Sequence, residues 1–221
     1  MKKGRKGLKT VIDLAMMALI LILMAYHVTG NRLHEWLGIL LFLLFFLHHF
    51  LNLKWYGSLV KGKYGAPRIV GVVLNFLLLA DMVCMMASSV MISRDVFGFP
   101  DIGGGEFGRR MHMVSVSWGF VLMSVHLGFH GGMMSHMAGK RVREKRKDLA
   151  VYACRLMAAA LSVYGICAFG EREMGAKMFL MVKYSFFDQG EPAAWVFADY
   201  FSVMVLFAVL SYYGMRRMRK R

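Results

Sequence analysis

Unbroken blocks of apolar residues, each about as long as a bilayer is thick, alternate along the chain with short polar segments. A soluble protein of this size would instead show apolar stripes on one face of each helix. The pattern predicts an all-α integral membrane protein in which helices and short connections make residues 1–221 a single membrane domain. The predicted spans are 10–29, 33–53, 69–92, 110–136, 149–169 and 194–214.

Lysine and arginine are unevenly divided between the two sets of connections. With alternating spans, both tails and the 53–68 and 138–148 connections share one side and carry twenty of the 28 Lys and Arg. The connections of the other side carry seven. By the positive-inside rule, both termini are cytoplasmic, Lys145 faces inward and Gly104 faces outward. Membrane topology thus explains where the basic residues lie. The net charge of +15 is therefore no reason to expect a nucleic acid partner.

Two outer connections have features of their own. The 95–108 segment contains Pro100 and a glycine run, but it lacks the Lys-Ser/Thr of a phosphate-binding loop, so it is interpreted as a plain connection. The 171–192 segment carries apolar clusters that fit either a short helix at the lipid boundary or a packed loop. Both readings stay open from the sequence.

Histidines are the main chemical signal, because ionisable side chains within spans are rare and usually functional. His34 and His48 lie 14 residues apart on the second predicted span, and His112 and His126 have the same spacing on the fourth. Fourteen residues are two heptads, so each pair shares a helix face, with about 21 Å between its members along the axis. The two spans run in the same direction, which places His34 level with His112 and His48 level with His126.

Two His–His pairs at two depths are what two stacked b-type haems require, since haem iron takes one imidazole from each side. Gly38 and Gly119 would let a flat ring approach a helix, and Arg32, Arg109 and Arg110 would meet the haem propionates at the outer end. No CxxCH motif is present, so covalent c-type attachment is excluded. The four-helix core of this site would be residues 10–136, with 149–214 as accessory helices.

The remaining histidines have less definite roles. His130 lies one turn beyond His126 on the same face and is a rival ligand, whereas His49 points about 100° away from His48. His27 and His136 sit near the interfaces, where hydrogen bonding or hydration is usual. Further polar residues in the spans fit structural pairing, a quinone pocket or a proton route: Asn75, Asp81, Arg155 and Asp199.

Three histidine motifs resemble those of the bacterial flavinylation-associated membrane cytochromes, which are related to di-haem cytochrome b subunits. They are His34-Glu35-Trp36-Leu37-Gly38, His48-His49-Phe50-Leu51-Asn52 followed by Trp55-Tyr56, and His126-Leu127-Gly128-Phe129-His130. The segments Phe186-Phe187-Asp188 and Ala198-Asp199-Tyr200 fit the C-terminal part of longer members.

The resemblance implies an electron-transfer subunit, rather than a stand-alone enzyme, in the bacterial cytoplasmic membrane. It would carry electrons from a quinol or a cytoplasmic donor to an extracytoplasmic partner, and any flavin would belong to that partner. Two other functions remain open. The histidines could bind a bare divalent ion in a transporter or sensor, although acidic or thiolate co-ligands are lacking. Alternatively, they could be structural in a membrane anchor for a redox complex.

Overall fold

The computed structural model describes residues 2–98, 105–139, 147–182 and 190–220, with side chains at 6–98, 105–130, 149–182 and 190–220. These segments are helical throughout, apart from their connections, and contain no strand. The helices are α1 (Lys2–Met24), α2 (Tyr26–Leu51), α3 (Leu53–Ser58), α4 (Ala66–Ile92), α5 (Gly105–Gly139), α6 (Lys147–Glu171), α7 (Met174–Met178) and α8 (Ala193–Met218). Six of them, α1, α2, α4, α5, α6 and α8, are long and apolar enough to cross a membrane.

The all-α prediction is therefore confirmed, and the six predicted spans correspond to six helices that could cross a membrane, but several boundaries differ. α1 begins at Lys2 instead of residue 10 and α8 continues to Met218, because long basic side chains allow a helix to extend past its apolar block. The predicted turn at 30–32 is not a loop. The chain breaks at Ala25, which is fully buried, and bends again at Gly30, whose φ of 66° favours glycine.

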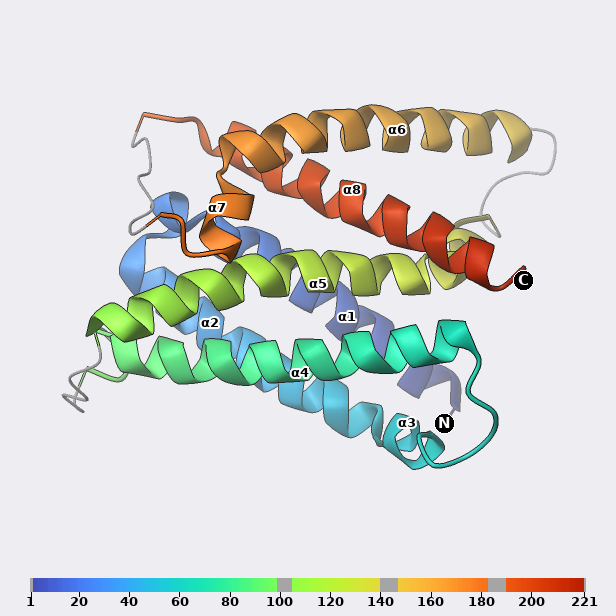
Figure 1. The fold of residues 1–221 in the computed structure, drawn as a ribbon, viewed down its shortest axis with the longest axis horizontal. Helices are drawn as coiled ribbons and strands as arrows, with labels where there is room; N and C mark the ends of the chain where they lie inside the picture. Colours follow the sequence, from blue (N-terminus) through green and yellow to red (C-terminus); the bar gives the residue numbers. More distant parts are fainter. Residues whose placement is uncertain (1, 99–104, 140–146, 183–189, 221) are drawn as a thin grey trace.

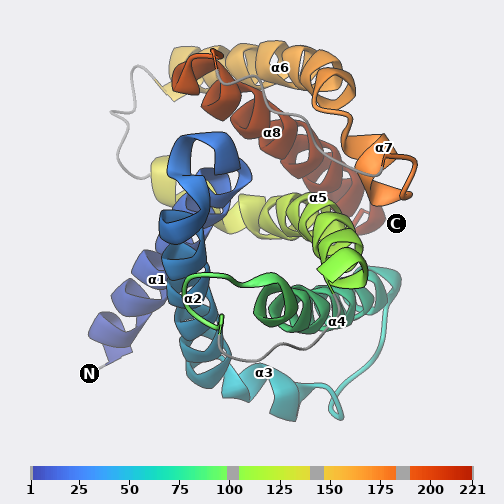
Figure 2. The ribbon, with the colours of Figure 1, turned by 90° about the vertical axis from the view of Figure 1, so that its left-hand side faces the viewer.

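The arrangement in Figure 1 places both termini at the same end of the bundle. α1 and α4 run away from that end, whereas α2 and α5 run toward it and are parallel to each other. In the end view, α1 lies beside α2, α4 beside α5, and α6 beside α8 on the far side of α5 (Figure 2). An even number of spans agrees with this arrangement; which end is cytoplasmic stays a prediction.

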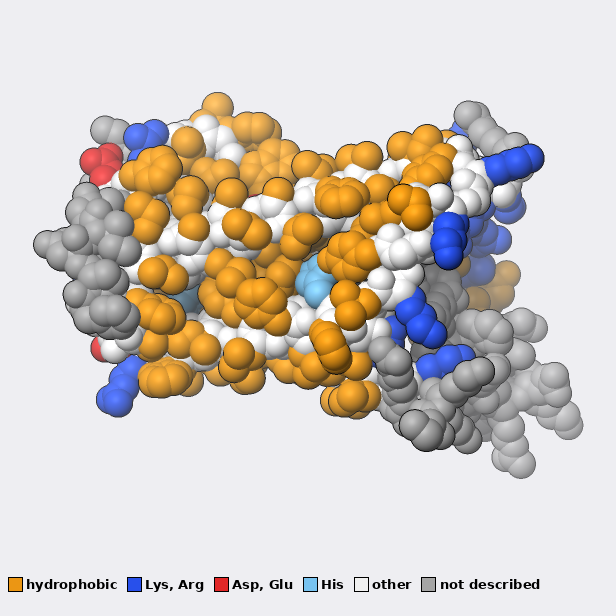
Figure 3. All heavy atoms as spheres, turned by 90° about the horizontal axis from the view of Figure 1, so that it is seen from below, with side chains coloured by type: hydrophobic (Ala, Val, Ile, Leu, Met, Phe, Trp, Pro, Cys, Tyr) orange, Lys and Arg blue, Asp and Glu red, His pale blue; other side chains and the backbone are white. Residues whose placement is uncertain are grey.

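The outer surface has the character of a lipid-facing one. Figure 3 shows hydrophobic side chains covering the middle of the molecule, with basic side chains concentrated at one end. On α6, Leu149 and Leu156 are 74% and 75% exposed. Such apolar exposure on a helix is unfavourable in water but not in hydrocarbon. This exposed apolar surface therefore supports a multi-pass membrane protein.

Small residues bring the helices of the second half together. A Cβ at Gly128 of α5 would collide with Ser211 and Ala208 of α8, and one at Gly165 of α6 would lie 2.5 Å from the carbonyl oxygen of Ser202. Ser211 also donates a hydrogen bond of 2.9 Å to the Val125 carbonyl. Close backbone approach at small residues is typical of helix packing in membranes. It fixes α6 and α8 against α5.

The segment after α6 resolves the choice left open between a surface helix and a packed loop, as far as it is described. Met174 and Met178 of α7 are buried, and Trp118 of α5 donates a hydrogen bond of 3.1 Å to the Met178 carbonyl. α7 is thus a packed turn of helix, while Phe179 and Met181 beyond it are exposed. The motif at 186–188 lies outside the described residues.

Candidate functional site

A cavity of about 460 Å³ lies between α2 on one side and α4 and α5 on the other. Its volume is within the range of about 300–1,000 Å³ found for cofactor and ligand pockets. It exists because α2 packs along α1, whereas its approach to α4 and α5 is sparse over the described part of the chain. Apolar side chains of the four helices α1, α2, α4 and α5 form most of its wall, and α7 and α8 contribute at one end.

His34 of α2 and His112 of α5 both line this cavity and face each other. Their ring centroids are 6.3 Å apart and their planes are inclined at 75°. Two imidazoles bound to opposite sides of one metal ion, with metal–nitrogen bonds of about 2 Å, have centroids about 6 Å apart. The structure therefore brings this pair to one depth, at a separation suited to an ion between them.

The Nδ1 atoms of the two rings differ in their surroundings. His112 Nδ1 is 3.3 Å from the hydroxyls of both Ser88 and Ser89 on α4. His34 Nδ1 is buried without a hydrogen-bond partner among the described residues, and the Tyr26 ring packs edge-on at 5.1 Å. A hydrogen bond at Nδ1 orients a histidine ring and leaves Nε2 available as a ligand. Of these two histidines, only His112 has a hydrogen bond at Nδ1 among the described residues.

Gly38 and Gly119 both line the cavity, but for different reasons. A Cβ added at Gly38 would meet nothing within 4 Å, so this glycine faces open space. A Cβ at Gly119 would collide with a carboxylate oxygen of Asp81 and lie 2.9 Å from Met85 Cε. Close packing with α4 therefore requires Gly119 even without a cofactor, whereas Gly38 has no such constraint.

Cations stand at the end of the cavity remote from the termini, but they are not the set that the sequence suggested. Arg109 lines the cavity; Arg110 and Arg32 are exposed and are not among the lining residues. Lys177 of α7 lines it instead, donating a hydrogen bond of 2.7 Å to the Arg172 carbonyl. Burial lowers the pKa of Lys177. Sequence reasoning missed Lys177 because its helix is only five residues long.

Glu35, next to His34, holds the start of the α4–α5 connection over the cavity. Its carboxylate accepts hydrogen bonds from the Ser93 hydroxyl at 2.7 Å and from three successive backbone N–H groups at 2.8–3.1 Å. These N–H groups belong to residues 94–96, just beyond the end of α4. Glu35 is therefore a positioning residue that ties α2 to α4.

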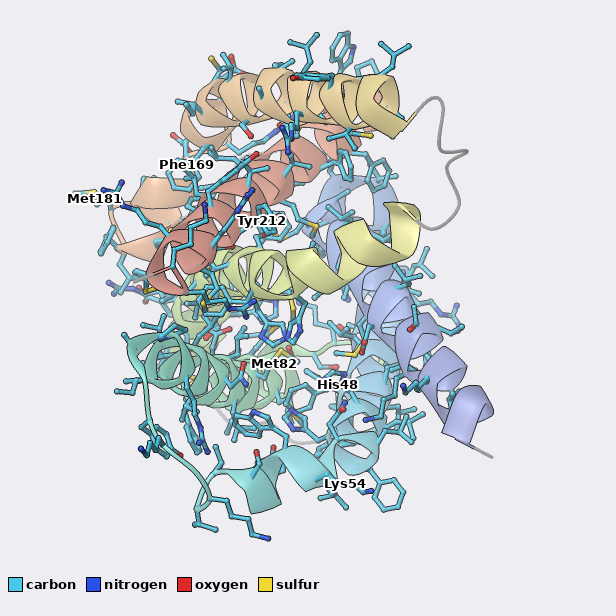
Figure 4. The ribbon with its side chains drawn as sticks, turned by 90° about the vertical axis from the view of Figure 1, so that its right-hand side faces the viewer. His48, Lys54, Met82, Phe169, Met181 and Tyr212 are labelled. Carbon is cyan, nitrogen blue, oxygen red and sulfur yellow. The ribbon has the colours of Figure 1, made fainter. Side chains whose placement is uncertain are left out.

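The second pair lies toward the end of the bundle that holds the termini. His48 Nδ1 is 2.7 Å from Asp13 Oδ1 of α1, and His126 Nδ1 is 3.0 Å from Asn75 Oδ1 of α4. Both acceptors come from helices that flank the pair. Figure 4, seen from this end, labels His48 on α2 and Met82 on α4. Asp13 was missed as a site residue, although an acid inside the first apolar block is itself a signal.

The second pair is less clearly opposed than the first. Over the described residues, no ring contact joins His48 to His126; the ring of His126 instead packs 4.8 Å from that of His130. His49 turns away, as predicted: its Nδ1 is 2.5 Å from the Tyr56 hydroxyl and its ring packs on Phe45. His130 therefore remains a rival of His126. The side chain of His136 lies outside the described residues.

An ion-pair network joins the end of α6 to the start of α8. Arg172 bonds Glu191 at 2.5 Å and Asp199 at 2.6 Å, and the Tyr164 hydroxyl donates to Asp199 at 2.5 Å. The hydrogen bonds from Arg172 lower the pKa of Glu191, and those of the two carboxylates raise the pKa of Arg172. Asp199 is thus structurally paired. Arg155 is exposed on α6.

Among the described side chains, no three His, Cys, Asp or Glu converge to hold a metal ion. A pair of histidines is nevertheless sufficient where a porphyrin supplies the other ligands. No protein-family model, curated protein or solved structure matches this chain.

Proposed function

We propose that this protein is a di-haem b-type membrane cytochrome that transfers electrons between the two sides of a bacterial cytoplasmic membrane. The observation that carries the proposal is the opposition of His34 and His112, 6.3 Å apart across a cavity of about 460 Å³ between membrane-spanning helices. The three histidine motifs that resemble flavinylation-associated cytochromes are independent of this geometry and favour the same function.

The residues around the outer pair fit such a group. His34 and His112 would hold the outer haem, with Gly38 leaving room for its face and Arg109 and Lys177 near its propionates. His48 and His126 would hold the inner haem, with His130 as the rival ligand. Bound haem would supply one-electron chemistry, and a histidine from each of two helices would hold it.

The chain itself contributes orientation and a dry environment. The hydroxyls of Ser88 and Ser89 and the amide of Asn75 hold the rings of His112 and His126 through Nδ1. Buried Leu41, Phe45 and Met82 lie between the two levels and exclude water there. The electron donor would be a quinol or a cytoplasmic protein, and the acceptor an extracytoplasmic flavoprotein.

No observation on the described residues specifically favours either alternative function. A divalent-ion transporter would need more than two converging ligands at each site, and the described side chains offer none beyond the pairs. A structural role for the histidines fits the hydrogen bonds of His48, His49 and His126 but gives no reason for His34 and His112 to lie 6.3 Å apart in the wall of a cavity.

An optical spectrum of the purified protein tests the proposal. Reduction by dithionite should produce the sharp bands of low-spin b-type haem, and a pyridine haemochrome assay should give two haems per chain. Protein that is colourless after expression with sufficient haem would refute the proposal. A ratio near one would show that one histidine pair is structural.

A further inference from the structure

The Nδ1 partners of the four proposed ligands differ systematically between the two ends of the bundle. At the inner pair, His48 is bonded to the carboxylate of Asp13 at 2.7 Å and His126 to the amide oxygen of Asn75 at 3.0 Å. At the outer pair, His112 is 3.3 Å from two hydroxyls, and His34 Nδ1 has no partner among the described residues. The inner imidazoles thus have the stronger acceptors.

This difference acts on the metal through the ring. An acceptor at Nδ1 makes an imidazole a stronger electron donor through Nε2, and a carboxylate does so more strongly than an amide or a hydroxyl. Electron donation and a nearby negative charge both stabilise ferric over ferrous iron, which lowers the reduction potential. We infer that the inner pair holds the haem of lower reduction potential, and that Asp13 sets this order through His48.

The inference rests on the proposed function and must be weighed against the other charges. Arg94, Arg109 and Lys177 at the outer cavity favour ferrous iron there and reinforce the order, whereas Glu35 opposes it. At the inner end, Arg219 is the cation whose field reaches His130, and it would raise the inner potential. The Asp13 side chain is half exposed but bonds a proposed ligand directly, whereas exposed Arg219 acts only through space and its field is screened by water.

The order of potentials gives the transfer a direction. If both haems are bound, one electron would pass from the inner group, which is oxidised, to the outer group, which is reduced, and no bond would form or break. A quinol or a cytoplasmic reductant replenishes the inner end, and a flavin of the partner accepts at the outer end. With the predicted topology, the downhill direction is from the cytoplasm outward.

Potentiometric titration of the purified holoprotein, followed by haem absorbance, tests the inference with three variants. The wild type should show two waves. In Asp13→Asn, which keeps an acceptor oxygen but removes its charge, the lower wave should shift upward and the upper wave should stay. Glu106→Gln removes an exposed carboxylate remote from His48 and should leave the lower wave in place. His34→Ala should lose the upper wave and retain the lower one.

The outcomes distinguish failure of the proposed function from failure of the inferred order of potentials. Absence of haem in the wild type refutes the proposed function. Two haems with a lower wave that Asp13→Asn leaves in place, or a His34→Ala protein that retains the upper wave, overturns the inference alone. If Asp13→Asn loses the inner haem, the tuning role is refuted, and His34→Ala still decides the order of potentials.

Discussion

His34 and His112 come from the second and fifth helices of the chain, yet their rings face each other with centroids 6.3 Å apart. Replacing either ligand should remove one haem and leave the other bound, because the second pair lies about 21 Å away along the helices. We therefore expect His34→Ala and His112→Ala each to contain one haem per chain by pyridine haemochrome assay. His49→Ala, whose ring contacts Tyr56 and Phe45, is the control and should retain two. Two haems in both outer variants would contradict the assignment.

At the inner pair, the competing candidates are His126 and His130, whose rings pack 4.8 Å apart. We expect His48→Ala and His126→Ala to lose one haem and His130→Ala to keep both, because His126 has an oriented Nδ1 and His130 has no hydrogen bond among the described residues. Haem content of the purified variants is the measurement. A loss in His130→Ala with retention in His126→Ala would exchange the two assignments and leave the di-haem proposal standing.

The two cavity glycines should respond in opposite ways to alanine. Gly119→Ala places a methyl group against Asp81 and Met85 and should destabilise the protein by about 1–3 kcal/mol, as overpacking does. Gly38→Ala meets no neighbour, so the fold should keep its stability while the outer haem binds less tightly. Thermal unfolding in detergent and haem content, measured on both variants, check this. Unchanged haem retention in Gly38→Ala would show that Gly38 does not face the cofactor.

Topology can be tested at exposed positions of opposite connections. Val60 lies after α3 and Met181 after α7, and they are 88% and 78% exposed. In intact cells, a membrane-impermeant maleimide should label Met181→Cys and reach Val60→Cys only after permeabilisation, because basic connections stay in the cytoplasm. The native cysteines are replaced first in both variants. The reverse labelling would invert the predicted topology and therefore the predicted direction of electron transfer. For two positions outside the described residues, we expect Gly104→Cys to be labelled in intact cells and Lys145→Cys only after permeabilisation.

Acid should weaken the outer ion-pair network. Because Arg172 lowers the pKa of Glu191 below its ordinary 4.5, the pair contributes stability fully above that value and loses it as pH falls through the lower native pKa. The melting temperature of the wild type should therefore approach that of Glu191→Gln below about pH 4.5 and exceed it near neutrality. Scans in detergent between pH 7 and pH 3 measure the difference. Parallel curves would show that the pair contributes no stability.

The six long apolar helices could be predicted from the order of residues alone, because apolar blocks of bilayer length have few other uses in a folded chain. The sequence also indicated that His34 and His112 share a depth, since two helices of the same direction and equal spacing leave little freedom. Exact ends were harder to predict: basic side chains prolonged α1 and α8, and the turn expected near Gly30 became a bend within α2.

The residues that surround the histidines could not be predicted without the arrangement of the helices in space. Asp13, Asn75 and Ser88 come from helices other than those of the rings they contact, and no periodicity encodes how one helix is rotated toward another. The same rotation brought Arg109 rather than Arg110 to the cavity and added Lys177 from a helix too short to predict. Length and spacing along one helix are local properties of a chain, whereas rotation and separation between helices depend on packing summed over all of them.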